Sequence, residues 1–128
     1  MKKKILLACL VGSLSATSAY SYTGECKGGT IVESTTGTTF CRSNKTMNWW
    51  SSQAWCQANG SQLATIYEMC PSWNGNISSY TCPEWNGNVT QDAWSATAEG
   101  SKTAISVRLP DGFVRSGLRS GDNYAFCR

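Results

Sequence analysis

The amino-acid sequence predicts a single α+β domain that is stapled by disulfides. Three observations lead to this prediction: two short helical segments in the first half, a terminal run of alternating strands, and an even number of cysteines after the leader. A long irregular loop over Cys70–Gln91, rich in Gly, Asn, Ser and Pro, separates the helices from the strands. Helices and strands that are segregated along the chain in this way are typical of α+β domains.

The chain begins with MKKKILLACLVGSLSATSAYS, which has three lysines, then an apolar run, then small residues. This order is typical of a bacterial secretory signal peptide, and the apolar run is too short for a permanent membrane span. Cleavage after Ala19 and cleavage after Ser21 both fit; we predict a signal peptide over 1–21 and one domain over 22–128. Lipidation at Cys9 is not expected, because cleavage there would leave almost no apolar segment. We expect a secreted, periplasmic or cell-surface protein without membrane insertion after signal removal.

The predicted mature domain is close to neutral. The chain has 11 basic and 8 acidic residues, and loss of the three leader lysines leaves the two signs equal. A neutral domain gives no support for nucleic-acid binding. The charge is uneven, because Lys102–Arg128 holds five basic and two acidic residues.

Six cysteines follow the leader: Cys26, Cys41, Cys56, Cys70, Cys82 and Cys127. In an exported chain this even number predicts three disulfides, for which fifteen pairings are possible. The chain has no histidine and no Cys-x-x-Cys pair, so we expect no metal at these cysteines. Without histidine there is also no Ser-His-Asp or Cys-His site. We therefore expect neither an enzyme nor a cofactor.

The segments before the long loop predict a hairpin and two helices. The stretch over 28–43 has two β-branched runs that turn at Thr36-Gly37, and a Cys26–Cys41 bridge would staple this hairpin. A helix is predicted over Trp49–Asn59, because Asn48 can cap its start and Gly60 can end it. A short strand over Gln62–Ala64 follows. The sequence Thr65-Ile-Tyr-Glu68 then predicts a capping box and a second short helix.

After the loop, DAWSATA, KTAISVRLPDGFVRSG and NYAFCR predict strands. Ile105, Val107 and Leu109 alternate with polar residues, and Pro110-Asp111-Gly112 predicts a tight turn. We expect these strands to form an antiparallel meander.

This order of elements resembles the C-type lectin-like fold, in the short secreted form found at the C-terminal ends of bacterial collagen-like adhesins. The matching positions are Trp50, Ala54, Cys56, Gly60, Leu63-Ala64-Thr65, Trp94-Ser95-Ala96-Thr97, Asp111-Gly112 and Ala125-Phe126-Cys127-Arg128. The resemblance implies a Cys56–Cys127 disulfide from the first helix to the last strand and, as in long-form members, a Cys26–Cys41 bridge. With these two assigned, Cys70 is left to pair with Cys82.

The resemblance also shows what this chain lacks. Calcium-dependent sugar binders of the family carry carboxylates in Glu-Pro-Asn or Gln-Pro-Asp and Trp-Asn-Asp motifs, because Ca²⁺ needs several oxygen ligands. The most similar stretches in this chain are two Trp-Asn-Gly sequences, which have Gly75 and Gly87 where the family has aspartate. Only Glu84 and Asp92 provide carboxylates nearby in the sequence. No metal and no calcium-dependent binding is expected.

A doubled phrase provides the candidate site: CPSWNGNIS starts at Cys70 and CPEWNGNVT starts at Cys82. One interpretation is structural, with a Cys70–Cys82 staple and both tryptophans covering the core. The other adds a ligand surface on which indoles stack against sugar rings and amides bind hydroxyl groups. The residues of that surface would be Trp73, Asn74, Trp85 and Asn86.

Two further groups of side chains bear on ligand binding: three arginines and the four remaining tryptophans. Arg108, Arg115 and Arg119 form a candidate patch for acidic polysaccharide, although an alternating arginine more often lies on the solvated face of a strand. The remaining tryptophans lie on regular elements, so we expect them in the core: Trp49, Trp50, Trp55 and Trp94.

The sequence thus favours an exported binding domain that recognises a carbohydrate or a surface protein. The alternative is a structural or assembly component of the bacterial cell surface. A third hypothesis is an oxidase, because relatives of this fold include the sulfatase-modifying oxidases. Those enzymes have a larger domain and use two reactive cysteines that are not committed to a structural disulfide.

Overall fold

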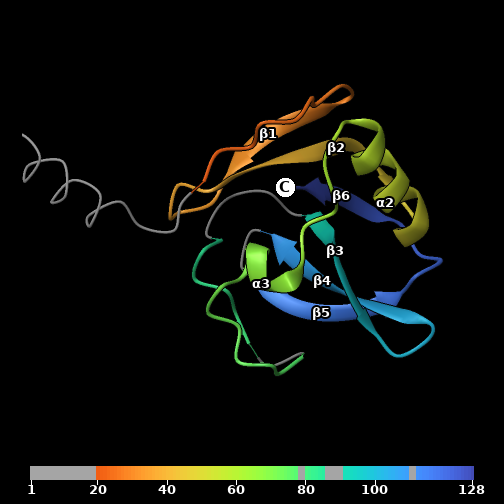
Figure 1. Cartoon of the computed structure of the whole chain (residues 1–128). Helices are drawn as coiled ribbons and strands as arrows, with labels where there is room; N and C mark the ends of the chain where they lie inside the picture. Colours follow the sequence, from red (N-terminus) through yellow and green to blue (C-terminus); the bar gives the residue numbers. More distant parts are fainter. Residues whose placement is uncertain (1–19, 78–79, 86–90, 110–111) are drawn as a thin grey trace, which may run out of the picture.

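The computed structural model describes residues 20–77, 80–85, 91–109 and 112–128. These residues form an α+β fold with two short helices, one mixed sheet and three disulfides (Figure 1). The elements in chain order are β1 (Gly29–Glu33), β2 (Thr39–Met47), α2 (Trp49–Ala58), α3 (Ile66–Met69), β3 (Gln91–Glu99), β4 (Thr103–Leu109), β5 (Phe113–Leu118) and β6 (Asn123–Cys127).

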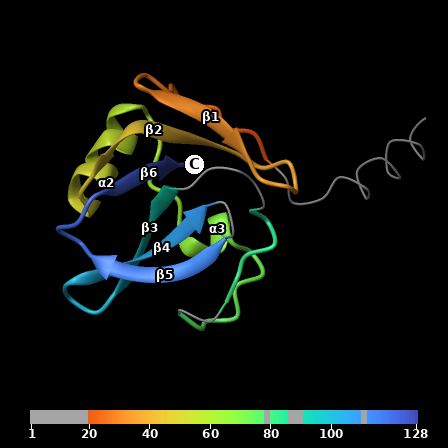
Figure 2. The ribbon, with the colours of Figure 1, turned by 180° about the vertical axis from the view of Figure 1, so that it is seen from behind.

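The six strands form a single sheet in the order β1-β2-β6-β3-β4-β5 (Figures 1 and 2). The predicted antiparallel meander is correct for β3, β4 and β5 but wrong for β6. This last strand returns to the middle of the sheet, where it runs antiparallel to β2 and parallel to β3, with Tyr124 opposite Ala93. A central place suits β6 because Ala125, Phe126 and Cys127 are fully buried.

The predicted hairpin is present as β1 and β2. Gly37 turns the chain with a φ of 92°, and its amide donates to the Ser34 carbonyl at 3.0 Å. β2 continues to Met47, beyond the predicted end at Ser43, because its second half pairs with β6.

Helix α2 begins and ends close to the predicted residues. The Asn48 side chain accepts a hydrogen bond from the Ser51 amide at 2.8 Å, and Gly60 leaves the helix with a φ of 75°. The buried face carries Trp49, Ser52 and Cys56. Trp50 was predicted to lie in the core, but this prediction was wrong: the side chain is 53% exposed, since it follows Trp49 around the helix and points away from the sheet.

A short bridge replaces the strand predicted over Gln62–Ala64. Leu63 pairs with Cys127 of β6 alone, and the Ala64 amide donates to the Phe126 carbonyl at 2.8 Å. The predicted capping box then starts α3, with Thr65 and Glu68 bonding each other's backbone amides at 3.2 and 2.8 Å.

The core lies on both faces of the sheet because successive strand residues point to opposite sides. On one face, α2 covers a cluster that contains Trp49 and Trp94, and Trp55 packs against it half-buried. On the other face, α3 and the loop that follows it cover a larger cluster, which includes Phe40, Trp85 and Phe126. The sheet therefore lies between α2 and α3, as the two views show (Figures 1 and 2).

The described chain starts at Tyr20, which already packs against the domain. Its ring lies edge-on to Phe40 at 5.9 Å, and its carbonyl accepts from the Thr39 amide at 3.1 Å. Tyr20, which lies before the predicted boundary at Tyr22, is thus part of the described fold. Among the described residues, no helix has the length and apolar character needed to cross a bilayer.

All three predicted disulfides are present: Cys26–Cys41, Cys56–Cys127 and Cys70–Cys82. They use every one of the six cysteines after the predicted leader. Three disulfides in so small a domain indicate an oxidising environment such as the periplasm or the cell exterior. The Cys56–Cys127 bridge spans 71 residues and contributes about 4 kcal/mol in the chain-entropy model.

Candidate binding site

The two copies of the doubled phrase are bonded to each other. Their cysteines form the Cys70–Cys82 disulfide, and their third residues meet where Ser72 Oγ donates to Glu84 Oε1 at 3.1 Å. Each copy also makes the same turn, in which the tryptophan amide donates to the cysteine carbonyl, at 3.0 Å for Trp73 and 3.2 Å for Trp85. The repeat therefore builds one staple from two equivalent turns.

The second turn is fixed to the rest of the fold on two sides. The Thr35 amide in the hairpin turn donates to the Glu84 carbonyl at 2.9 Å, and the Cys82 amide donates to the Gly112 carbonyl at 2.8 Å. Gly112 has a φ of 73°, and a β-carbon there would lie 2.3 Å from the Cys82 carbonyl oxygen. Only glycine permits this close approach between the loop and the start of β5.

These attachments place Trp85 inside the core. It is 7% exposed and contacts Phe40 and Phe126 with ring centroids at 5.6 and 5.4 Å. Its indole N–H donates to the Met69 carbonyl at 2.7 Å. For Trp85 the structural interpretation therefore holds: a buried indole with an occupied N–H offers no face to a ligand.

Trp73 lies at the surface of the same loop. Its side chain is half-buried, and its ring lies 5.5 Å from that of Tyr67 on α3, tilted by 54°. Tyr67 is 59% exposed. The Trp73 indole N–H donates to the Asn76 carbonyl at 2.8 Å, and the exposed Asn74 side chain accepts from the Asn76 amide at 3.0 Å. We call Tyr67, Trp73 and Asn74 the aromatic surface.

The structure brings together only part of the predicted ligand set. Trp73 and Asn74 are neighbours at the surface, whereas Trp85 is buried in the core. Asn86 lies outside the described residues. Tyr67 was missed by the sequence reasoning. Its position as the second residue of a helix that starts with a capping box, just before Cys70, was the available signal.

The three arginines are engaged with the protein's own groups. Arg115 pairs with Asp92 at 3.1 Å, and the Arg108 guanidinium stacks over Phe113 at 5.2 Å. Arg119 stacks over Trp49 at 4.4 Å and donates to the Thr103 and Gly100 carbonyls at 3.0 and 2.6 Å. Arg108 and Arg115 share the α2 face of the sheet. Arg119 lies beyond the end of β5, so the three do not form one continuous free patch.

Among the described residues, one group has the composition of a metal site: Cys70, Cys82 and Glu84. The two sulfurs are bonded to each other, so neither is the thiolate that a metal requires. Glu84 is 9% exposed and accepts from Ser72, while Asp92 pairs with Arg115. The two carboxylates that the sequence offered for calcium therefore have protein partners.

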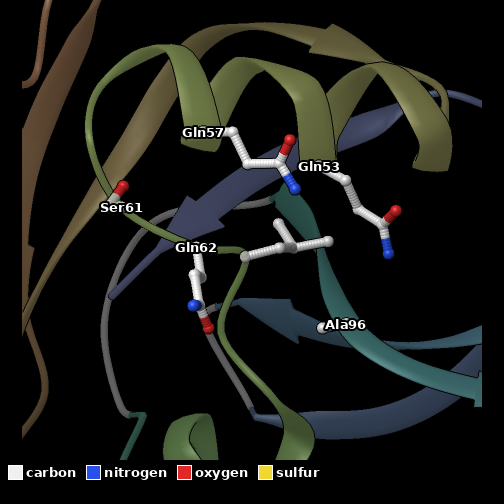
Figure 3. Close-up of a pocket in the computed structure, with 6 residues that line it drawn as sticks. Gln53, Gln57, Ser61, Gln62 and Ala96 are labelled. Atoms are coloured by element: carbon white, nitrogen blue, oxygen red, sulfur yellow. The ribbon is translucent and has the colours of Figure 1, made fainter.

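A hollow of about 400 Å³ lies elsewhere, between α2 and β3 (Figure 3). It is lined by Gln53, Gln57, Ser61, Gln62, Leu63 and Ala96. Gln53 and Gln57 extend from successive turns of α2, and Gln62 comes from the segment that follows it. Leu63 is the next residue in the chain. We call this hollow the glutamine groove. The sequence reasoning missed it, although the spacing of Gln53 and Gln57 places both on one helix face.

In comparisons with known proteins, no family model, no curated protein and no solved structure matches this chain.

Proposed function

We propose that this protein is an exported binding domain of C-type lectin-like fold that recognises a neutral carbohydrate without calcium. The sequence motifs of the back half support the fold part of this proposal. So does the Cys56–Cys127 bridge from α2 to β6, which the resemblance implies. The leader and the three disulfides support export.

The aromatic surface is the observation that carries the binding proposal. Among the described residues, Tyr67 is one of four large apolar side chains that are mostly exposed, at 59%, and it lies against the half-buried Trp73. The Trp73 indole is held in place by Asn76, so a ligand would meet a ring that is already oriented. Aromatic faces with a polar group at the edge suit sugar rings, which have apolar C–H faces and hydroxyl rims.

The proposal assigns no catalytic step to this surface. The six cysteines that an oxidase would draw on are all joined in disulfides. Glu84, a carboxylate within the loop, is buried and hydrogen-bonded to Ser72.

A glycan array with the oxidised protein tests the proposal, using Trp73→Ala as the loss variant and Trp50→Ala as its matched control. Trp50 is also an exposed tryptophan, but it lies on α2. We expect binding to neutral glycans in both calcium and chelator, lost in Trp73→Ala and kept in Trp50→Ala. Binding to no glycan, with capture of a surface protein instead, would favour a protein ligand. No binding to either would favour the structural or assembly role.

A further inference from the structure

The backbone around the glutamine groove is held in place by the fold. The Cys56–Cys127 disulfide ties α2 to β6, and Leu63 pairs with the same Cys127. On the other side, the Ala96 amide of β3 donates to the Ala64 carbonyl at 2.6 Å. Leu63, at the floor of the groove, is thus held against β6, and Ala96 of β3 is bonded to the residue after Leu63. The backbone of the groove is therefore in place before any ligand binds.

The polar groups of the groove are of two kinds. Ser61 Oγ is already engaged, because it donates to the Cys56 carbonyl at 3.0 Å and accepts from the Tyr22 hydroxyl at 3.0 Å. In the described part of the chain, by contrast, no side-chain hydrogen bond involves Gln53, Gln57 or Gln62. Each amide side chain offers two donors and one acceptor. Three such groups around one hollow give a site with unused hydrogen-bonding capacity.

The lining limits the class of ligand. None of the six lining residues is charged, so the groove has no counter-charge for an ionic ligand. None is aromatic, so it lacks the stacking face that the aromatic surface offers to a sugar. Apolar floor and amide walls instead suit a neutral chain that alternates amide groups with small side chains.

The spacing of the glutamines favours a peptide backbone. Gln53 and Gln57 are four residues apart on α2, which puts their β-carbons about 5–6 Å apart on one face. In an extended peptide, carbonyl groups on the same side recur every second residue, about 6.7 Å apart. Flexible glutamine side chains span the remaining difference, so each can bind one of two peptide groups that lie two residues apart on the same side of the peptide. Figure 3 shows both leaving α2 toward the same hollow.

We propose that the glutamine groove is a second binding site, which takes an extended, uncharged peptide segment through its backbone amides. This site is separate from the aromatic surface, because the groove lies on the α2 side of the sheet and the surface on α3 and its loop. It does not depend on the proposed carbohydrate binding.

Nuclear magnetic resonance of the ¹⁵N-labelled, oxidised protein tests this proposal through the glutamine side-chain NH₂ signals. The probe is a terminally blocked hexapeptide of alternating serine and threonine. We expect saturable shifts of the Gln53 and Gln57 signals. Affinity, followed on the remaining Gln62 side-chain signal, should fall at least about tenfold in Gln53→Ala/Gln57→Ala, since two hydrogen bonds are lost. Ala58→Gln, which adds an amide at an exposed position outside the groove, should leave affinity unchanged.

Two further arms make the test decisive. The same hexapeptide with N-methylated backbone amides should bind at least about fivefold more weakly, because it still accepts from the glutamine NH₂ groups but no longer donates to their carbonyls. Equal binding of the methylated peptide would overturn backbone recognition. A neutral trisaccharide that shifts the same signals in place of the peptide would overturn the peptide assignment, and no shift at millimolar peptide would overturn the site.

Discussion

Replacing Trp85 by alanine is expected to destabilise the protein by about 4 kcal/mol or more. The same change at Trp73 is expected to cost about 1 kcal/mol, which is typical of a partly exposed position. The two tryptophans occupy equivalent places in the doubled phrase, so each is the natural control for the other. The difference between the two losses of unfolding free energy therefore measures how much burial contributes to the stabilisation by a tryptophan at this place in the motif.

The magnitude for Trp85 follows from its contacts. Truncating a buried tryptophan costs about 3–5 kcal/mol. Trp85 also packs tilted against Phe40 and edge-on to Phe126, and its loss leaves the Met69 carbonyl without the indole donor. An orphaned buried acceptor adds about 1–3 kcal/mol, which places this variant toward the upper end.

Guanidinium unfolding with intact disulfides, followed by circular dichroism, measures both costs. With a guanidinium slope of about 2–6 kcal/mol per molar, a loss of 4 kcal/mol lowers the midpoint by about 0.7–2 M. If Trp85→Ala does not fold, Trp85→Phe keeps an aromatic ring, removes the N–H and should cost about 1–3 kcal/mol. A cost at Trp85 no larger than at Trp73 would refute the burial argument.

Three further predictions concern the turn at Gly112, the start of the chain and calcium. Gly112→Ala should cost at least about 1 kcal/mol more than Gly75→Ala in unfolding free energy, because both have positive φ but only the first meets a carbonyl oxygen; equal costs would contradict this. Burial, aided by Glu68 and opposed by Arg128, raises the pKa of Tyr20 above 10, so the unfolded state loses that proton first and stability should fall as pH rises past 10. Tyr20→Phe should show a smaller fall in the same pH titration, and an unchanged fall would exclude Tyr20 as a cause. Thermal midpoints in chelator and in millimolar calcium should agree; a rise of several degrees with calcium would reveal a cation site.

Local features of the fold could be predicted from the sequence because short stretches determine them. Asn48 and Gly60 bound α2, Thr65 starts α3, and Gly37 turns the first hairpin. Each depends on the backbone preferences of a few adjacent residues. The disulfide pairing was also correct, but it came from the resemblance to a family and not from spacing.

Long-range pairing could not be predicted in this way. Alternation identified NYAFCR as a strand, but it did not say that β6 would insert between β2 and β3. Neighbours in a sheet are chosen by burial and by contacts distant in sequence, which an alternating pattern does not encode. Trp50 shows the same limit on a helix, since its exposure depends on which face α2 turns to the sheet.

The candidate site shows most clearly what a motif leaves open. Trp73 and Trp85 occupy equivalent places in nearly identical stretches and make the same turn, yet one is half-buried and the other is in the core. Attachments of the second copy to Thr35 and Gly112 decide the difference, and both are far from it in the chain. The glutamine groove likewise needs Ala96 of β3 beside α2, which only the folded chain provides.

The most direct test of carbohydrate binding at the aromatic surface uses the indole N–H signals of the ¹⁵N-labelled protein, assigned with Trp73→Phe and Trp85→Phe. The ligand is the strongest neutral glycan from the array. We expect this glycan to shift the Trp73 signal together with the Asn74 side-chain signal and to leave the Trp85 signal in place. Binding that leaves the Trp73 and Asn74 signals unchanged would contradict this expectation.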